Sequence, residues 1–384
     1  MGVHSIQRRV TSCQPRILVV SEIPTPYRLP LYSLLAQRPE IELDLVFCSR
    51  DEPDRPWDLG PALEGVPHRF LNGVSPEVRT RHGTFVYQLN PAAVPLAARG
   101  KHDAVVVGGY SVFAEQVAMG VSRLRRIPYL LHSESTLSAV RPRLVRLAKQ
   151  ALVRPAVRGA AAGLAAGTQA KRYLVHYGLR PERIRIVPNT IDVEGYRRAA
   201  EDIRGRAAEV REARGLPERF VLFAGRLIED KGILDLLQAQ SMLGRSSLPL
   251  VIAGEGRLES DVKAAEGTRH VGFQQTEPLI ELYALADWTV VPSHREPWGV
   301  VVNEALACGS PVIVTDRVGA AADLVVDGVN GRVVPAAAPE ALAAALAGPK
   351  PSGDPSSGPI EGWTHEFAAE QFLDAVQLVL AGRR

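Results

Sequence analysis

Two carboxylate side chains, Glu296 and Glu304, stand with seven residues between them in the segment SHREPWGVVVNEALACGSPVIV. Pro297 and Gly299 predict a loop around Glu296, and a short helix beginning at Val300 is expected to carry Glu304. The first backbone amides of a helix lack partners within it, so amides near Gly299 and Val300 can bind an anion without a metal ion. Carboxylates that accept hydroxyl hydrogen bonds on both sides of an anion site suit a phosphate joined to sugars. The alternative is that both glutamates are solvated surface residues.

Two basic residues, Arg226 and Lys231, lie five positions apart in FAGRLIEDKG, at the start of a predicted helix. Arginine offers phosphate oxygens a planar fork and lysine a compact charge, so the two could balance a diphosphate. Gly225 and Gly254, the latter in VIAGEGRL, allow close approach of the backbone. The chain contains no Asp-x-Asp sequence to hold a divalent ion under a diphosphate, so we expect neither a metal ion nor another cofactor. Alternatively, the two basic residues only cover the helix end in water.

Bulk composition excludes several classes of protein. The 384 residues are enough for two domains, and a formal net charge of +3 gives no case for a nucleic-acid partner. No run of 18 uncharged apolar residues predicts a transmembrane helix, and residues 1–16 lack the apolar stretch of a secretory signal. The three cysteines have no metal-ligand spacing, so a reducing cytoplasm is the expected location.

Strands and helices are expected to alternate along the chain, which predicts an α/β fold with two doubly wound parallel sheets. The expected strands are 16–21, 43–48, 69–71, 104–107, 129–132, 163–166 and 184–187, then 220–224, 250–253, 271–273, 288–291, 312–314 and 332–334. The expected division is a first domain over 1–192, a linker and surface helix over 193–218, a second domain over 219–365 and a final amphipathic helix in 366–384. Ligands of such sheets bind beyond the carboxyl ends of the strands, so the cleft between the domains is the expected site.

Several motifs together carry a family resemblance. GRLIEDKG, AGEG, VGF and VPSHREPWGVVVNEALACGSPVI occur in that order, with PNTIDV before them at residues 188–193. With this set, which spans most of residues 185–335, the chain resembles the retaining GT-B glycosyltransferases of family 4. The resemblance implies two Rossmann-like domains facing a cleft, the first holding the acceptor and the second a nucleotide-diphosphate sugar. It also implies that the final helix crosses back to the first domain.

The resemblance assigns roles to residues of the second domain. Arg226 and Lys231 would bind the diphosphate and stabilise the departing phosphate, and Glu296 would accept hydrogen bonds from the donor sugar. The remaining donor contacts would be backbone atoms near Gly225, Gly254, Phe273, Trp298, Gly299 and Val300, and the Glu304 carboxylate on the ribose. The departing phosphate oxygen can itself take the acceptor proton in this family, so no dedicated protein base is implied.

In the first domain the loop IPTPYR has prolines where relatives often have glycines. Glycines at these positions of the relatives approach the donor phosphate. In this chain Arg28 could make that contact instead, or could be a surface residue, and Tyr27 is beside it. His132 and Glu134, in LLHSES, are candidates for donor-sugar and acceptor contacts, and the competing interpretation of His132 is a structural histidine.

Residues 121–158 hold nine Lys or Arg and one acid. A basic amphipathic helix over 143–157 could lie on an anionic membrane, giving a peripheral location at its inner face, or could be a packed helix with a solvated basic side. The expected function is transfer of a hexose-type sugar from a UDP or GDP sugar to a carbohydrate, lipid-linked or small-molecule hydroxyl. The alternatives are a sugar phosphorylase, a nucleotide-sugar epimerase or a non-catalytic nucleotide-binding protein. A dinucleotide oxidoreductase is disfavoured, because no G-x-G-x-x-G follows the first strand.

Overall fold

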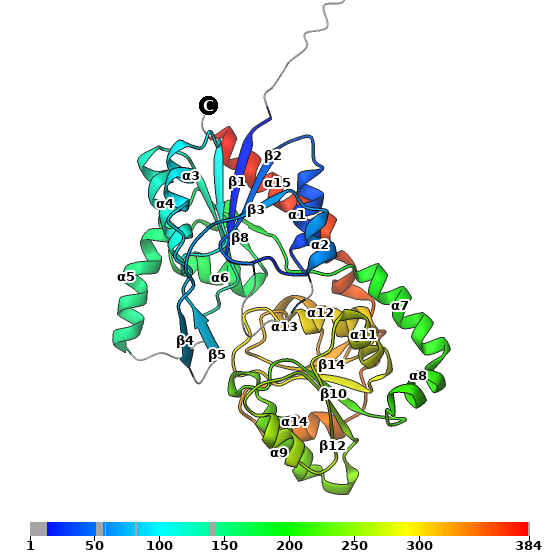
Figure 1. Cartoon of the computed structure of the whole chain (residues 1–384). Coiled ribbons are helices and arrows are strands. Elements are labelled where there is room, and N and C mark those ends of the chain that lie inside the picture. Colours follow the sequence, from blue (N-terminus) through cyan, green and yellow to red (C-terminus); the bar gives the residue numbers. More distant parts are fainter. Residues whose placement is uncertain (1–13, 51–56, 58, 81–82, 138–142, 383–384) are drawn as a thin grey trace, which may run out of the picture.

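The computed structural model of the protein describes residues 14–50, 57, 59–80, 83–137 and 143–382. Its strands form two large sheets, and the parts of the molecule built on them lie one above the other in Figure 1. All neighbouring strands within each of these two sheets are parallel. The predicted fold class, two Rossmann-like parallel-sheet domains, is confirmed.

The first domain is built on a seven-stranded sheet with the order β3-β2-β1-β6-β7-β8-β9. Its strands are β1 Arg16–Ser21, β2 Glu42–Phe47, β3 His68–Phe70, β6 Ala104–Val107, β7 Tyr129–Ser133, β8 Ala162–Ala165 and β9 Ile184–Ile186. The helices along this part of the chain are α1 Leu29–Ala36, α2 Gly60–Glu64, α3 Ala93–Arg99, α4 Phe113–Leu124, α5 Arg143–Gly159 and α6 Thr168–His176. A separate antiparallel pair, β4 Glu77–Thr80 and β5 Gly83–Val86, was not among the expected strands.

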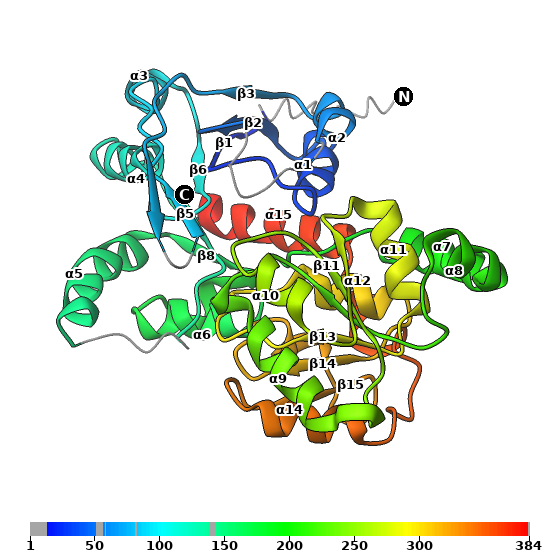
Figure 2. The ribbon, with the colours of Figure 1, turned by 60° about the horizontal axis from the view of Figure 1, so that its bottom comes forward.

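The last helix of the chain, α15 His365–Ala381, covers one face of the first sheet. Its buried residues Phe372 and Val376 belong to one apolar cluster with Ile17 of β1 and Leu164 of β8. Figure 2 shows α15, in red, beside the blue α1, so the two ends of the sequence meet in one layer. The first domain therefore depends on a segment that follows the whole of the second domain in the sequence.

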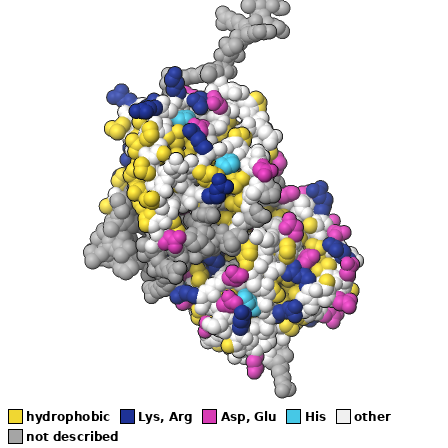
Figure 3. All heavy atoms as spheres, in the orientation of Figure 1, with side chains coloured by type: hydrophobic (Ala, Val, Ile, Leu, Met, Phe, Trp, Pro, Cys, Tyr) yellow, Lys and Arg dark blue, Asp and Glu magenta, His cyan; other side chains and the backbone are white. Residues whose placement is uncertain are grey.

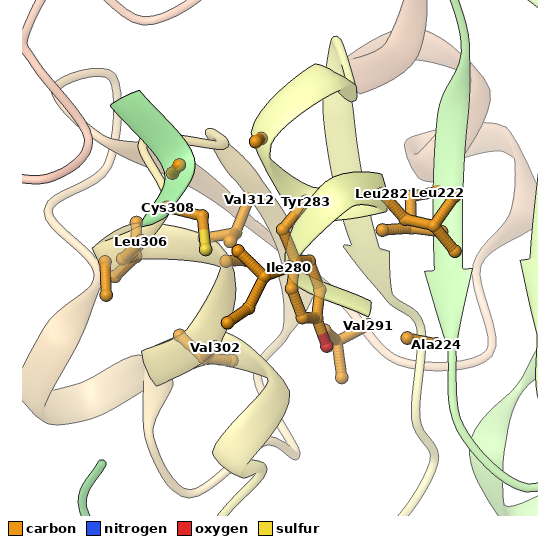
Figure 4. Close-up of a cluster of buried hydrophobic side chains, with 14 of the residues drawn as sticks. Leu222, Ala224, Ile280, Leu282, Tyr283, Val291, Val302, Leu306, Cys308 and Val312 are labelled. Carbon is orange, nitrogen blue, oxygen red and sulfur yellow. The ribbon is translucent and has the colours of Figure 1, made fainter. Parts of the chain in front are cut away.

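The second domain is built on a six-stranded sheet with the order β12-β11-β10-β13-β14-β15. Its strands are β10 Val221–Ala224, β11 Leu250–Ala253, β12 Thr268–Gly272, β13 Trp288–Val291, β14 Val312–Thr315 and β15 Gly331–Val334. Its helices are α9 Ile233–Leu243, α10 Glu259–Ala264, α11 Thr276–Leu285, α12 Val300–Ala307, α13 Ala321–Leu324 and α14 Pro339–Ala347. Figure 4 shows one side of the core, where Tyr283 and Ile280 of α11 meet Val302 and Leu306 of α12 beside the sheet.

Residues 193–218 differ from the expected linker and surface helix. They contain two helices, α7 Val193–Gly205 and α8 Ala207–Arg214, visible at one side of Figure 1. Ala200, Ile203 and Val210 are buried in the same apolar cluster as α11 and α12. The segment packs as part of the second domain because its apolar residues recur at helical spacing between the many charged ones.

The strand expected at 271–273 begins three residues earlier, at Thr268. β12 is at the edge of its sheet and has no fully buried residue, whereas its partner β11 is buried at every position. An edge strand keeps one side in water, so Arg269 and His270 are tolerated in it and the apolar run that signals a central strand is missing.

Candidate active site

Loops from the carboxyl ends of strands in both sheets meet at the junction between the domains. The backbone N–H and hydroxyl of Thr168, at the start of α6, donate hydrogen bonds to Asp323 of α13, the hydroxyl at 2.6 Å. Gly167 is packed so closely against Trp298 that a Cβ atom there would lie 2.4 Å from the indole ring. These contacts fix the ends of the first sheet against the loop between β13 and α12.

That loop holds Glu296, which forms an ion pair with Lys231, the last residue of a short 3-10 helix after β10. Both side chains are largely buried, with 20% of Lys231 and 14% of Glu296 exposed. The backbone of Glu296 is fixed as well, because the N–H of Gly319 donates to its carbonyl oxygen at 3.0 Å. The structure therefore brings together two residues that the sequence analysis placed on different parts of a bound donor.

Three glycines with positive φ, Gly225, Gly254 and Gly299, lie in the loops around this ion pair. Gly299, with φ 95°, directly precedes α12 and has no side chain to cap the helix, so the first amides of α12 lack a capping side chain from that position. Gly254, with φ 144°, approaches Gly225 so closely that a Cβ atom would lie 1.9 Å from the Gly225 carbonyl oxygen. The half-exposed Arg226 follows Gly225 on the same loop. A side chain at Gly254 would force these two loops apart, and a Cβ atom at Gly299 would lie 3.1 Å from side-chain atoms of Glu296 and Val318.

Glu304 is engaged on both oxygens by tyrosine hydroxyls. Tyr283 donates to one at 2.8 Å and Tyr196, from α7, to the other at 3.5 Å. Burial raises the pKa of Glu304, and the two tyrosine hydrogen bonds oppose that rise. A ribose would have to replace or join these hydroxyls, so the ribose contact stays a prediction. No sequence pattern indicated Tyr196, because it lies in the segment expected to be a linker.

Two aromatic residues predicted near the donor differ in setting. The Trp298 side chain is buried, stacks on Trp363 with ring centroids 5.8 Å apart, and donates from its indole N–H to Asn303 at 3.0 Å. The Trp298 side chain is therefore engaged within the protein, and the ligand contact expected of its backbone stays a prediction. Phe273 is half-buried after β12, and its carbonyl oxygen accepts a hydrogen bond from Gln274 at 3.0 Å.

Three of the predicted site residues of the first domain, Arg28, His132 and Glu134, form one polar cluster. Arg28 forms an ion pair with Glu134, and its guanidinium also contacts Nδ1 of His132 at 3.0 Å. Since Arg28 can only donate, that nitrogen must accept. Burial acts to lower the pKa of Arg28, but the charge and hydrogen bond of Glu134, together with Tyr32 and Tyr27, outweigh burial and raise the pKa. The Arg28 side chain is 13% exposed, so it is not a surface arginine. Tyr27 is nearby in sequence but contacts Trp57 edge-on.

The setting of His132 supports the structural alternative and predicts a pH dependence of folding. Burial, and then the charge of Arg28, lower the pKa of His132 to about 3, while Glu134 acts in the opposite direction. In the unfolded chain this histidine binds a proton below about pH 6.5, whereas in the native state it stays neutral down to about pH 3. The free energy of unfolding therefore decreases as the pH falls from about 6.5 towards 3. Urea unfolding at pH 7, 6, 5 and 4 should show a weaker pH dependence for His132→Gln than for the wild type. Equal slopes in the two proteins would contradict this account.

On the face in Figure 3, basic and acidic side chains are mixed over the second domain. Within the described ranges, no three His, Cys, Asp or Glu side chains gather closely enough to hold a metal ion. Nor does any helix of the described chain have the length and apolar character needed to cross a membrane. The helix expected at 143–157 is present as α5. The structure does not describe the side chains of residues 143–149 and 152, so the predicted basic face of this helix stays a prediction.

Comparisons of whole structures define the fold as GT-B. The Anabaena protein Alr3699/HepE, solved in complex with UDP, matches with a TM-score of 0.64 and 18% identity over 96% of this chain and 98% of that one. An α,α-trehalose-phosphate synthase (UDP-forming) from Burkholderia vietnamiensis matches with a TM-score of 0.65 and 13% identity over 94% of this chain and 99% of that one.

Sequence comparison adds a family match for the second domain. Residues 207–348 match the sequence model of the family Glycosyl transferases group 1. A D-inositol 3-phosphate glycosyltransferase from Thermomonospora curvata is 31% identical over 247 residues, 56% of this chain and 57% of that protein. The chain spans between about a third and just over half of the length of the curated relatives it matches.

Proposed function

We propose that this protein is a family 4 GT-B glycosyltransferase that moves a hexose-type sugar from a UDP or GDP sugar to a hydroxyl group. The observation that carries the proposal is the ion pair of Lys231 and Glu296 beside the open N-terminus of α12. In the proposal Lys231 is a cation for the diphosphate and Glu296, beside it, is an acceptor for sugar hydroxyls. Both residues lie within the part of the chain that matches Glycosyl transferases group 1. The UDP complex of the Anabaena protein with the same fold supports a nucleotide sugar as donor.

In the proposed reaction the bond between the anomeric carbon and the diphosphate breaks, and the acceptor oxygen bonds to the same face of that carbon. Lys231, Arg226 and the amides at the start of α12 would stabilise the negative charge on the departing diphosphate. Because the acceptor oxygen bonds to the face that the diphosphate leaves, the anomeric configuration is retained. The departing diphosphate would take the acceptor proton, so no protein base is needed. Lys231 would turn from Glu296 to the diphosphate when donor binds, which frees Glu296 for the sugar hydroxyls.

Release of UDP or GDP from UDP-glucose, UDP-galactose and GDP-mannose, measured with and without sugar and lipid-linked acceptors, tests this proposal. We expect release that depends on an acceptor and is unchanged by a chelator. A requirement for inorganic phosphate would indicate a phosphorylase, and donor conversion without release an epimerase. Nucleotide binding without any turnover would indicate a binding protein.

A lipid-linked acceptor would bring the first domain to a membrane surface. Arg154 and Arg158, exposed near the end of α5, are the described part of the surface that we propose for this peripheral contact. Co-sedimentation with anionic vesicles but not with neutral ones is the expected result, and equal binding to both would contradict it.

A further inference from the structure

Asn189 lies where the chain leaves the first domain, just after β9, and is 2% exposed. Its side-chain oxygen accepts a hydrogen bond from Arg28 at 3.3 Å. Its side-chain nitrogen donates to Glu134 at 2.8 Å. Since Arg28 and Glu134 also pair with each other, the three side chains form a closed triangle. The amide of Asn189 supplies both the donor and the acceptor that this arrangement needs.

The backbone of the same residue reaches the second domain. Its carbonyl oxygen accepts a hydrogen bond at 3.4 Å from the side-chain nitrogen of Asn303, a completely buried residue of α12. The side-chain oxygen of Asn303 accepts the indole N–H of Trp298 at 3.0 Å. Trp298 directly precedes Gly299 and the first amides of α12. One path of hydrogen bonds therefore joins Arg28 and Glu134 to the loop that would hold the donor.

We propose that Asn189 and Asn303 are positioning residues that set the first-domain side of the site, at Arg28 and Glu134, against the donor-binding amides of α12. The inference rests on the proposed function and deepens it. Neither residue needs to touch a substrate. Sugar transfer requires the acceptor oxygen and the anomeric carbon to be held within a small distance of each other, and a displacement of about 1 Å can lower a rate about 100-fold. A hydrogen-bonded link between the two domains at the site therefore affects turnover more than it affects the binding of donor or acceptor alone.

The link can be cut without separating the domains. Asn303→Asp keeps the oxygen that accepts from Trp298 and removes the donor to Asn189. Asn189→Ala keeps the carbonyl oxygen and removes the contacts with Arg28 and Glu134. In both variants the hydrogen bonds from Thr168 to Asp323 still join the domains. A matched control is Asn90→Ala, because Asn90 is equally buried but donates only within the first domain, to the carbonyls of Cys48 and Leu71.

Three quantities should be measured for each variant: the Kd of UDP or GDP, the kcat of transfer, and hydrogen exchange with and without the nucleotide. We expect a Kd within about twofold of the wild type and a kcat about tenfold lower in both variants. In the double variant, kcat should be no more than about threefold below the worse single variant, since both interrupt one path. Nucleotide should slow amide exchange in residues 130–136 of the wild type but not in Asn303→Asp. Asn90→Ala should retain wild-type values of all three.

Values of kcat and exchange equal to those of Asn90→Ala in both variants would overturn the inference, as would losses that multiply in the double variant. If Asn303→Asp fails to fold, the kcat and Kd of Asn189→Ala alone test the inference: a wild-type kcat would overturn it. A wild-type protein that binds no nucleoside diphosphate would overturn the proposed function and this inference together. Nucleotide binding with unchanged exchange at residues 130–136 overturns the inference alone.

Discussion

Replacing Glu296 by Gln is expected to lower the rate of sugar transfer about 100-fold while nucleoside diphosphate still binds. Glu296 lies beside the proposed diphosphate site, because it pairs with Lys231. A charged acceptor makes hydrogen bonds to sugar hydroxyls about twice as strong as a neutral amide does, and contacts that strengthen in the transition state appear in kcat. The nucleotide Kd should stay the same or decrease, because the variant no longer offers Lys231 a competing carboxylate.

The matched control for this variant is Glu281→Gln. Glu281 is also a partly buried carboxylate in an ion pair, with Arg214 at 2.7 Å, but it lies on α11 away from the loop of Glu296. Initial rates at saturating donor, together with nucleotide Kd, separate the two effects. Wild-type turnover in Glu296→Gln would remove this carboxylate from the active site.

Replacing Lys231 by Met is expected to lower kcat by about 100- to 1,000-fold, the range found when one stabilising group for a developing negative charge is removed. The loss should be larger for transfer than for donor binding, since charge on the leaving oxygen increases as the bond to the sugar breaks. The measurement is kcat and donor KM at one pH and ionic strength. We expect a smaller relative change in KM than in kcat.

Lys350→Met is the control for the loss of a lysine charge. Lys350 pairs with Asp287 at 2.7 Å, and its side chain is about half exposed. It should leave both kinetic constants unchanged. If Lys231→Met raised KM alone, Lys231 would contribute only to donor binding and not to stabilisation of the leaving group.

Central buried strands were the part of the fold that sequence patterns predicted best. β10, VLFA, is buried at every position, and a continuous apolar run of this length is typical of a strand covered on both faces. The edge strand β12 and the small β4–β5 pair were misplaced or missed, because neither needs such a run. The packing of α7 and α8 on α11 and α12 depends on residues distant in sequence, which periodicity cannot identify.

The candidate site was predictable as a set of residue types but not as a set of partners. The spacing of Arg226 and Lys231 indicated a diphosphate, and that of Glu296 and Glu304 a phosphate joined to sugars. Nothing in either spacing indicated that Lys231 pairs with Glu296. The tyrosine hydroxyls on Glu304 were missed for the same reason, since Tyr196 is 108 positions away. For Asn189 a signal existed in the motif PNTIDV, but its links to Glu134 and Asn303 appear only once the two domains are placed together.

Thermal stability with UDP, GDP, ADP and dTDP, each with and without chelator, tests the central claim most directly. A nucleotide at about 100 times its Kd should add roughly 2.7 kcal/mol to the free energy of unfolding. The account predicts a clear increase in Tm with one of the four, unchanged by chelator and lost in Arg226→Ala. No increase with any of them would contradict a nucleotide-sugar site in this protein.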